Sequence, residues 1–290
     1  MTPNKKSFWR RGWFKATALI ILVAIGVFAV MAYKYQAALF PEPTYDEVAP
    51  DIPDFGLQEG DLETKILIFS KTNGFRHLDA IPAARKLFEN IAVKNGWNSF
   101  YTENAAIHNS EDLGQFDLLI WSNVSGDVLT AEQREVFKAY LENGGSVLAV
   151  HGTGGDPEYS WSWYPEEFIR AQFIGHPIFP QFREATIHIE DREHPAMQYL
   201  PEYWQREEEW YSFAESPRGR VTVLATIDET EYDIKDEIAM GEDHPLIWHH
   251  QVGEGTVFYS ALGHQASAYD EPEHQAMLEE AIKWLLEKQL

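Results

Sequence analysis

Three short apolar segments of this chain each lead to a histidine, and this feature constrains the fold most. The pairs are 65–69 with His77, 146–150 with His151, and 256–260 with His264. Open α/β sheets build their sites in this way, with polar residues placed just past the carboxyl ends of strands. Because parallel strands end at one edge of a sheet, the sequence predicts that the three histidines meet in one crevice.

The first half of the chain alternates apolar strands with amphipathic helices. We expect strands over 65–69, 97–101, 116–121 and 146–150, and helices over 79–94 and 130–142. Thr130 and Gln133 have the spacing of a capping box, and Asn143-Gly144-Gly145 ends that helix. Continuous apolar strands separated by helices predict a mainly parallel sheet with helices on both faces, as in flavodoxin-like proteins.

The second half is less regular. Residues 156–182 are rich in aromatics and proline and predict a long ordered excursion. Alternating segments over 185–190 and 220–227 predict antiparallel strands. A hairpin is expected where 245–252 and 256–260 flank Gly253-Glu254-Gly255, and a closing amphipathic helix over 274–288.

The N-terminal region differs sharply from the rest in charge. Six of the 23 Lys and Arg residues lie in residues 1–40, which hold no acid, so 17 basic and 46 acidic side chains remain for the other 250 residues. So acidic a body should repel nucleic acid and anionic surfaces. Neutral sugars and metal cations are better suited as ligands.

Ala16–Tyr33 is an uncharged, mostly apolar run. As a helix it spans about 27 Å, close to the hydrocarbon core of a bilayer. The basic flank predicts a single-pass membrane protein with a cytoplasmic N-terminus and a periplasmic or extracellular body. A cleaved signal peptide is the alternative, with 30–32 as a loose cleavage site.

These features divide the chain into four parts. We expect a cytoplasmic basic tail over 1–15, a transmembrane helix over 16–33, a proline-rich acidic linker over 34–63 and one folded domain over 64–290.

The chain has no cysteine, which excludes disulfides, zinc–thiolate sites and cysteine nucleophiles. Even so, 148–155 reads Leu-Ala-Val-His-Gly-Thr-Gly-Gly, a strand followed by one polar residue and glycines. That pattern is typical of a nucleophile elbow, here with His151 in the place of the nucleophile. The elbow geometry is expected, whereas thiol chemistry is excluded.

At this point the sequence resembles a known family, the trehalose-utilisation (ThuA-like) family. The matching segments are 71–77, 121–129, 144–151, 175–177, 191–195, 208–211, 243–249 and 259–264. Together they cover roughly residues 64–288. The resemblance implies a class I glutamine amidotransferase-like fold and a link to sugar metabolism. Where the family usually has alanines after the elbow, this chain has Gly152-Thr-Gly-Gly155.

Four residues are the candidate catalytic groups: His151, His77, His264 and Glu209. The family pattern places an acid before Trp-Tyr, and an acid beside aromatics suits a raised pKa and general acid–base work. The candidate substrate-binding residues are Trp163, Trp210, Tyr211, His176 and Asp156. Aromatic faces would stack on sugar rings.

A metal site is also open. Neutral imidazoles with a carboxylate can hold Zn²⁺, and His151, His249 and His264 are its candidate ligands. No local metal motif is present, so distant loops would have to assemble it.

Two functions stay open. One is an exported enzyme that acts on a sugar, a glycoside or a keto-sugar by histidine and glutamate acid–base chemistry. The other is a non-catalytic sugar-binding or scaffolding module. A glutamine amidotransferase is excluded because it needs a cysteine.

Overall fold

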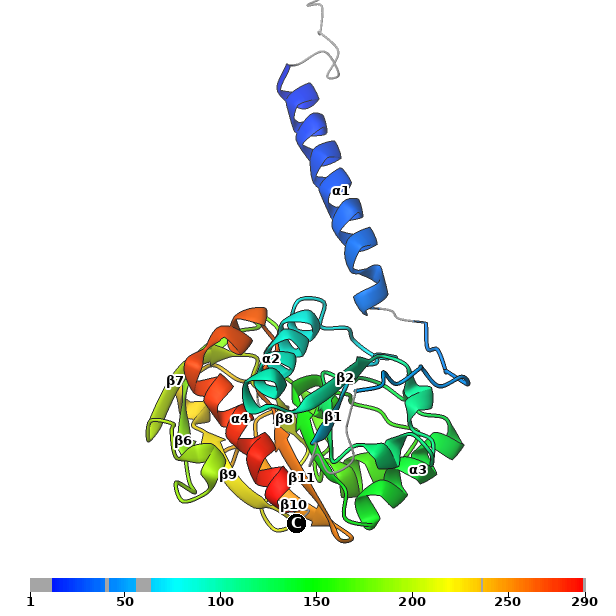
Figure 1. The fold of residues 1–290 in the computed structure, drawn as a ribbon. Helices are drawn as coiled ribbons and strands as arrows, with labels where there is room; N and C mark the ends of the chain where they lie inside the picture. Colours follow the sequence, from blue (N-terminus) through cyan, green and yellow to red (C-terminus); the bar gives the residue numbers. More distant parts are fainter. Residues whose placement is uncertain (1–11, 40–41, 56–63, 236, 289–290) are drawn as a thin grey trace, which may run out of the picture.

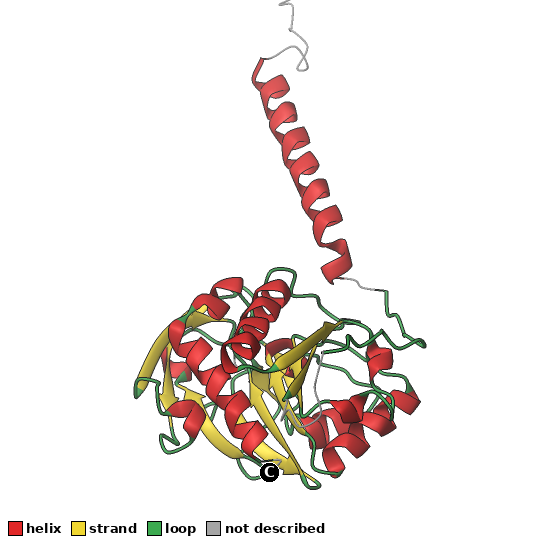
Figure 2. Cartoon of the chain, viewed as in Figure 1, coloured by secondary structure: helices red, strands yellow, loops and turns green. Residues whose placement is uncertain are grey.

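A mixed sheet forms the centre of the body (Figures 1 and 2). The computed structural model describes residues 12–39, 42–55, 64–235 and 237–288, and within them the sheet has nine strands. In spatial order these are β2 (Asn98–Thr102), β1 (Lys65–Phe69), β3 (Leu118–Ser122), β4 (Ser146–Val150), β11 (Gly255–Ser260), β10 (Pro245–Val252), β9 (Thr222–Ile227), β6 (Arg183–Ile189) and β7 (Tyr203–Glu208).

The first five strands in this order, from β2 to β11, are parallel. All residues of β3, β4 and β11 are buried, as continuous apolar strands covered on both faces should be. The predicted order, with 65–69, 117–121 and 146–150 as neighbours, is confirmed. The expected strand bounds differ from the observed ones by one or two residues.

Helices cover both faces of the parallel half, as predicted. On one face, Trp121 of β3 stacks on Phe137 of α3 (Ala131–Glu142) with 4.4 Å between ring centroids. On the other face, the Ser146 hydroxyl donates to the Leu285 carbonyl of α4 (Pro272–Glu287). Lys94 of α2 (Ala80–Asn95) forms an ion pair with Glu279, so α2 lies beside α4. The expected capping box of Thr130 and Gln133 is present.

The other strands, β10, β9, β6 and β7, are antiparallel to one another, as expected for the second half. The predicted hairpin joins β10 to β11 through Gly253-Glu254. Gly253 has φ +61°, and a Cβ there would lie 2.6 Å from the backbone of Glu142, so this turn needs a glycine.

β7 was not predicted. Its sequence, Tyr-Trp-Gln-Arg-Glu-Glu, carries three charges, and Glu207–Glu209 reads as a solvated charged run. In the structure Trp204, Arg206 and Glu208 point inward and are buried. Arg206 neutralises Glu208 at 3.0 Å, so charged side chains occupy the inner face of this strand as a pair. β5 (Phe173–Gly175) and β8 (Ser212–Phe213) form a small second sheet next to it.

The N-terminal helix α1 (Gly12–Leu39) rises away from the body in Figure 1. Trp13–Tyr33 is long and apolar enough to cross a membrane, and a signal sequence near the N-terminus would pass the same test. The helix continues six residues beyond the predicted span, into the region expected to be linker. Part of the predicted tail and linker, residues 1–11, 40–41 and 56–63, lies outside the described residues.

Residues 42–55 have no helix or strand, but they are fixed to the body. Asp46 pairs with Lys71 at 2.7 Å and accepts a hydrogen bond from the backbone of Ala105. The Val48 carbonyl accepts from Asn104. This segment, named the tether below, is therefore packed along the surface of the body.

Candidate functional site

The candidate site residues come from four strand ends. His77 lies in the loop between β1 and α2, His151 directly follows β4, and His264 follows β11. Glu209 directly follows β7. Strand direction alternates from β11 through β10, β9 and β6 to β7, so β7 runs in the same direction as β11. The carboxyl end of β7 therefore lies at the same edge of the sheet. The crevice is therefore at the edge where open α/β sheets bind ligands.

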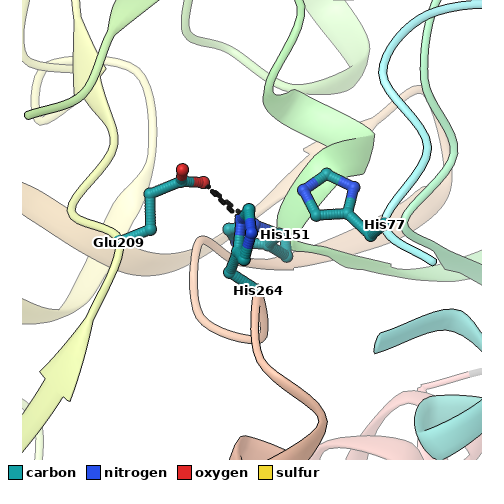
Figure 3. A group of neighbouring side chains, drawn as sticks. All are labelled: His77, His151, Glu209 and His264. Carbon is teal, nitrogen blue, oxygen red and sulfur yellow. Dashed lines mark hydrogen bonds and ion pairs between the residues drawn. The ribbon is translucent and has the colours of Figure 1, made fainter. Parts of the chain in front are cut away.

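The four side chains point toward one another (Figure 3). One nitrogen or oxygen atom from each of His77, His151, Glu209 and His264 lies within 4.8 Å of the others. Glu209 Oε2 is 2.7 Å from Nδ1 of His264 and 3.4 Å from Nε2 of His151. The two histidine nitrogens are 3.3 Å apart. The three histidines thus share one place, as their positions at strand ends predict.

His151 occupies a strained elbow. Its φ is +46°, in the left-handed region that non-glycine residues rarely adopt. Its Nδ1 donates to the Ala261 carbonyl at 2.7 Å, which leaves Nε2 directed into the cluster. A Cβ on Gly152 would lie 2.9 Å from the His77 ring, so the glycine after the elbow lets the His77 ring approach closely.

A second set of polar groups surrounds the cluster. Tyr211 Oη is 3.0 Å from Nε2 of His151, and His176 Nε2 is 3.2 Å from Oε1 of Glu209. Gln181 donates to the same oxygen at 2.5 Å. Asp156 accepts a very short hydrogen bond from the backbone of Gly126. All of these side chains line an open cleft of about 1360 Å³ that also exposes His77, Glu209 and His264.

The charge state of Glu209 differs from the expected one. Burial disfavours its charge, but hydrogen bonds with His151 and His264 outweigh burial and hold the pKa of Glu209 well below its ordinary value. The prediction of a raised pKa was therefore wrong. Glu209 is a carboxylate at neutral pH, so it can accept a proton or bind a cation, but it has no proton to donate.

Two other groups have shifted pKa values. Burial, with the nearby His151 and His264, lowers the pKa of His77 well below its ordinary value, so its ring is neutral. Burial raises the pKa of Asp156 to about 6, although the hydrogen bond from Gly126 opposes this. Asp156, and not Glu209, is thus the carboxyl group in the cleft that can hold a proton near neutral pH.

Two predicted aromatic contacts are wrong. Trp163 stacks on Trp161 with 4.7 Å between ring centroids and packs against the core, outside the cleft. Trp210 is fully buried. Because Glu209 and Tyr211 face the cleft, the residue between them points away from it. The aromatic wall of the cleft is instead formed by the exposed Phe75 and the largely buried Phe173.

Of the three candidate metal ligands, His151 and His264 lie in the cluster and His249 does not. His249 lies on β10, where its ring is 5.2 Å from that of His194 and 4.8 Å from that of Trp284, in a separate pocket. His249 pairs with Phe258 in the middle of β11, and its ring contacts Trp284 of α4, so it lies on a face of the sheet and not at the edge where the crevice opens. His77 and Glu209 complete the cluster in its place.

Three supporting residues escaped the sequence analysis. Glu208 accepts hydrogen bonds from the backbone of Gly263 and His264, at 3.0 and 3.3 Å, and so holds the loop that carries His264. Gln181 carries no signal in the sequence. His244 is fully buried and bonded through both nitrogens, to Glu229 and to the Tyr211 carbonyl, each at 2.7 Å.

The residues of the cluster fit a divalent cation. Three imidazoles and one carboxylate are a donor set that Zn²⁺ accepts. The second nitrogen of His151 is fixed by a carbonyl, as is usual for metal-binding histidines. The neutral ring of His77 has a lone pair to offer, and its buried Nδ1 has no hydrogen-bond partner.

An α/β sheet with a histidine elbow, and without any cysteine, defines the class: a protein with amidotransferase-like architecture that cannot use thiol chemistry. The model of the trehalose utilisation (ThuA) family matches residues 65–285, and the chain belongs to this family. None of the curated proteins matches the chain in sequence.

Solved structures show the same fold. A ThuA-like protein from Bacteroides uniformis has a TM-score of 0.66 at 20% identity, over 80% of this chain and 95% of the other. A ThuA-like protein from Parabacteroides merdae has a TM-score of 0.59 at 16% identity, over 77% of this chain and 90% of the other. The family gives a carbohydrate-related role in a broad sense.

Proposed function

We propose that this protein is an exported, membrane-anchored enzyme that acts on a sugar, a glycoside or a keto-sugar at a bound divalent metal ion. One observation carries the proposal: four ligand atoms from four separate strand ends lie within 4.8 Å of one another at the base of an open cleft. Buried titratable groups are costly unless they are paired or bind a metal, so such a cluster favours chemistry over simple packing.

His77, His151, His264 and Glu209 would hold the ion, and Zn²⁺ is the first candidate. A bound Zn²⁺ supplies Lewis acidity, which polarises a carbonyl or hydroxyl oxygen of a ligand. The fixed carboxylate of Glu209 offsets the charge of the cation.

The surrounding side chains suit a small carbohydrate. Phe75 and Phe173 offer apolar ring faces, while Tyr211, His176 and Gln181 offer hydrogen bonds. Asp156, whose pKa is raised to about 6, can exchange a proton with a ligand hydroxyl near neutral pH. We propose Asp156 as the general acid–base group, a role that the sequence analysis had assigned to Glu209.

Two alternatives remain. The same atoms form a consistent hydrogen-bond network without a metal, since Tyr211 can donate to His151 while His264 donates to Glu209. In that case the site would use acid–base chemistry alone. A non-catalytic sugar-binding module is the second alternative, and it would need only the aromatic and amide groups.

The metal content of the purified full-length protein tests the proposal. We expect about one zinc ion per chain by elemental analysis after chelation and reconstitution. Removal of a residue that only supports a metal ligand typically weakens metal binding by about 10–100-fold. His264→Ala removes a ligand itself, so it should weaken zinc binding by more than that. His249→Ala is the matched control, because His249 lies in a separate pocket.

If neither the wild-type protein nor the control retains zinc or another divalent ion, the metal proposal fails. The activity of the metal-free protein on sugars and keto-sugars then separates acid–base catalysis from simple binding. Asp156→Asn should abolish turnover while binding of the sugar persists. Binding of a sugar by the wild type without any turnover would support the binding module.

We also propose that α1 anchors the chain in a membrane, with the N-terminus in the cytoplasm and the body outside. The support is the apolar window Trp13–Tyr33, none of which is buried against the body. Cell fractionation should find the chain in the membrane. A mature protein that begins near Tyr33 by mass spectrometry would contradict the anchor and support a cleaved signal peptide.

A further inference from the structure

The tether attaches to the loop that carries His77. The backbone N–H of Thr44 donates to the side chain of Asn73 at 2.9 Å, and the Asn73 amide returns a hydrogen bond to the Thr44 carbonyl at 3.0 Å. Lys71, which is 6% exposed, pairs with Asp46 at 2.7 Å. The chain is therefore fixed to the body only four residues before His77, at the edge of the sheet where the cleft opens.

Chain length then limits how far this edge can lie from the membrane. Thr44 is the eleventh residue after Tyr33, the end of the apolar window. The six residues up to Leu39 are helical and add about 9 Å, and the remaining five can add about 17 Å at most. Whatever path residues 40–41 take, Thr44, which is hydrogen-bonded to Asn73, lies within about 26 Å of the span. Phe28 and Tyr33 themselves border the mouth of the cleft.

The mouth of the cleft carries large exposed apolar side chains. Phe75 is 40% exposed on one side, and Ile178 and Phe179 are 75% and 94% exposed on the other. Phe75 and Ile178 line the cleft directly, and the segment of Phe179 also supplies His176 and Gln181 to the site. We call Phe75, Ile178 and Phe179 the rim. Exposed apolar side chains gathered at one opening are typical of an interaction surface.

We propose that the rim lies in the headgroup layer of the membrane that α1 spans, so that the cleft opens toward the bilayer surface. This inference rests on the proposed anchor. The tether brings this surface nearest to the rim, and aromatic and aliphatic side chains are those that enter the interface. Because the body is strongly acidic, a neutral or zwitterionic headgroup layer suits it better than an anionic one.

The absence of cysteine makes the test direct. Full-length Phe179→Cys, labelled with an environment-sensitive fluorophore, is placed in phosphatidylcholine nanodiscs. We expect blue-shifted emission and about twofold quenching by lipids that carry a nitroxide on the headgroup, since interfacial groups enter to about 5–10 Å. Val93→Cys is the matched control. Val93 is 78% exposed near the carboxyl end of α2, at the opposite edge of the sheet, so its label should not be quenched.

The outcomes separate the rim from the anchor. If the protein enters nanodiscs but positions 179 and 93 are quenched equally, the rim proposal is overturned and the anchor stands. If the full-length protein does not co-elute with nanodiscs at all, the anchor fails and the rim proposal fails with it. Efficient disulfide formation between two unlabelled Phe179→Cys chains in the nanodisc would show a second copy on the rim and would also overturn the proposal.

Discussion

The two halves of the sheet are stabilised by different interactions. In the parallel half, buried apolar side chains do almost all the packing, as with Trp121 against Phe137. In the antiparallel half, buried polar pairs replace part of that packing: Arg206 with Glu208, and His244 with Glu229. Each pair also holds a segment of the site, the His264 loop in one case and Tyr211 in the other.

This difference teaches where precision comes from. The parallel half delivers His77 and His151 from the ends of strands that apolar burial fixes. The antiparallel half delivers Glu209 and Tyr211 from irregular chain, which has no ladder to hold it. Hydrogen bonds to buried charges are stronger and more directional than apolar contacts, so they can position such a segment. Four predictions test this contrast, from the largest expected effect to the smallest.

Trp121→Ala should cost the most stability. Trp121 is fully buried and packs on Phe69, Phe137 and Phe168, so its removal leaves a cavity in the parallel half. We expect the free energy of unfolding to fall by about 3–5 kcal/mol in urea titrations. Trp161→Ala is the control, because that ring is only partly buried and should cost clearly less. Equal losses would contradict the apolar account of this half.

His244→Leu should cost nearly as much in the antiparallel half. Both nitrogens of His244 face acceptors, so the ring donates twice, and its loss leaves the Glu229 carboxylate without its partner. We expect about 3 kcal/mol, the low end for a broken buried pair, because the backbone N–H groups of Met240 and Gly241 still bond to Glu229.

A double-mutant cycle with Glu229→Gln measures the pair itself. We expect a coupling of about 1 kcal/mol or more, and a weak coupling, below about 0.5 kcal/mol, would show that the pair does not support this half. His244→Leu should also displace Tyr211, because His244 bonds to the Tyr211 carbonyl. The affinity for zinc, or the quenching of Tyr211 fluorescence, should therefore change in His244→Leu and not in Trp161→Ala.

Two buried groups, His108 in the parallel half and Glu229 in the antiparallel half, should respond to acid over different pH ranges. His108 packs beside Trp121, and burial lowers its pKa to about 4. As the pH drops from about 6.5 toward 4, the histidine binds a proton in the unfolded chain but not in the folded one. The free energy of unfolding therefore falls over this range. Glu229 has a lowered pKa because, although burial opposes it, bonds from His244, Met240 and Gly241 favour its charge. Its contribution is present above about 4.5 and is lost below that pH.

His108→Leu isolates the first range. Between pH 7 and pH 5, the variant should lose roughly 2 kcal/mol less unfolding free energy than the wild type. His188→Leu serves as the control, since His188 is only partly buried on β6. An unchanged pH slope in His108→Leu would show that His108 is not held neutral by burial.

Thr130→Ala should have the smallest effect. The Thr130 side chain accepts from the backbone of Gln133, and the Gln133 side chain accepts in return from the backbone of Thr130. Loss of this cap should cost about 1 kcal/mol in the same urea titrations. Thr222→Ala, an exposed position on β9, should cost less. The comparison shows how little a local signal contributes next to tertiary burial.

The sequence predicted the parallel half well because its signals are local. Continuous apolar strands, the cap at Thr130 and the glycines after β4 each fix the conformation of a few neighbouring residues. Topology then places the ends of β1, β4 and β11 together, which is why the positions of His77, His151 and His264 could be inferred. The resemblance to the trehalose-utilisation family also rests on local sequence segments of this kind.

The antiparallel half was harder because its signals are not local. β7 was missed since three of its six residues are charged, and only Arg206, Gly263 and His264 explain why Glu208 can be buried. The choice between Trp210 and Tyr211 as a site residue depends on which way one irregular segment turns. His249 was assigned to the metal cluster because a histidine on a strand does not reveal which edge of the sheet it approaches.

The sequence by itself determined the fold class, the apolar N-terminal helix, the exclusion of thiol chemistry and the set of histidines that could meet. The tertiary structure alone decided that Glu209 is ionised and that Asp156 is the group able to hold a proton. The physical reason is that backbone conformation follows from neighbouring residues, whereas the charge state of a buried group depends on partners that are distant in the chain.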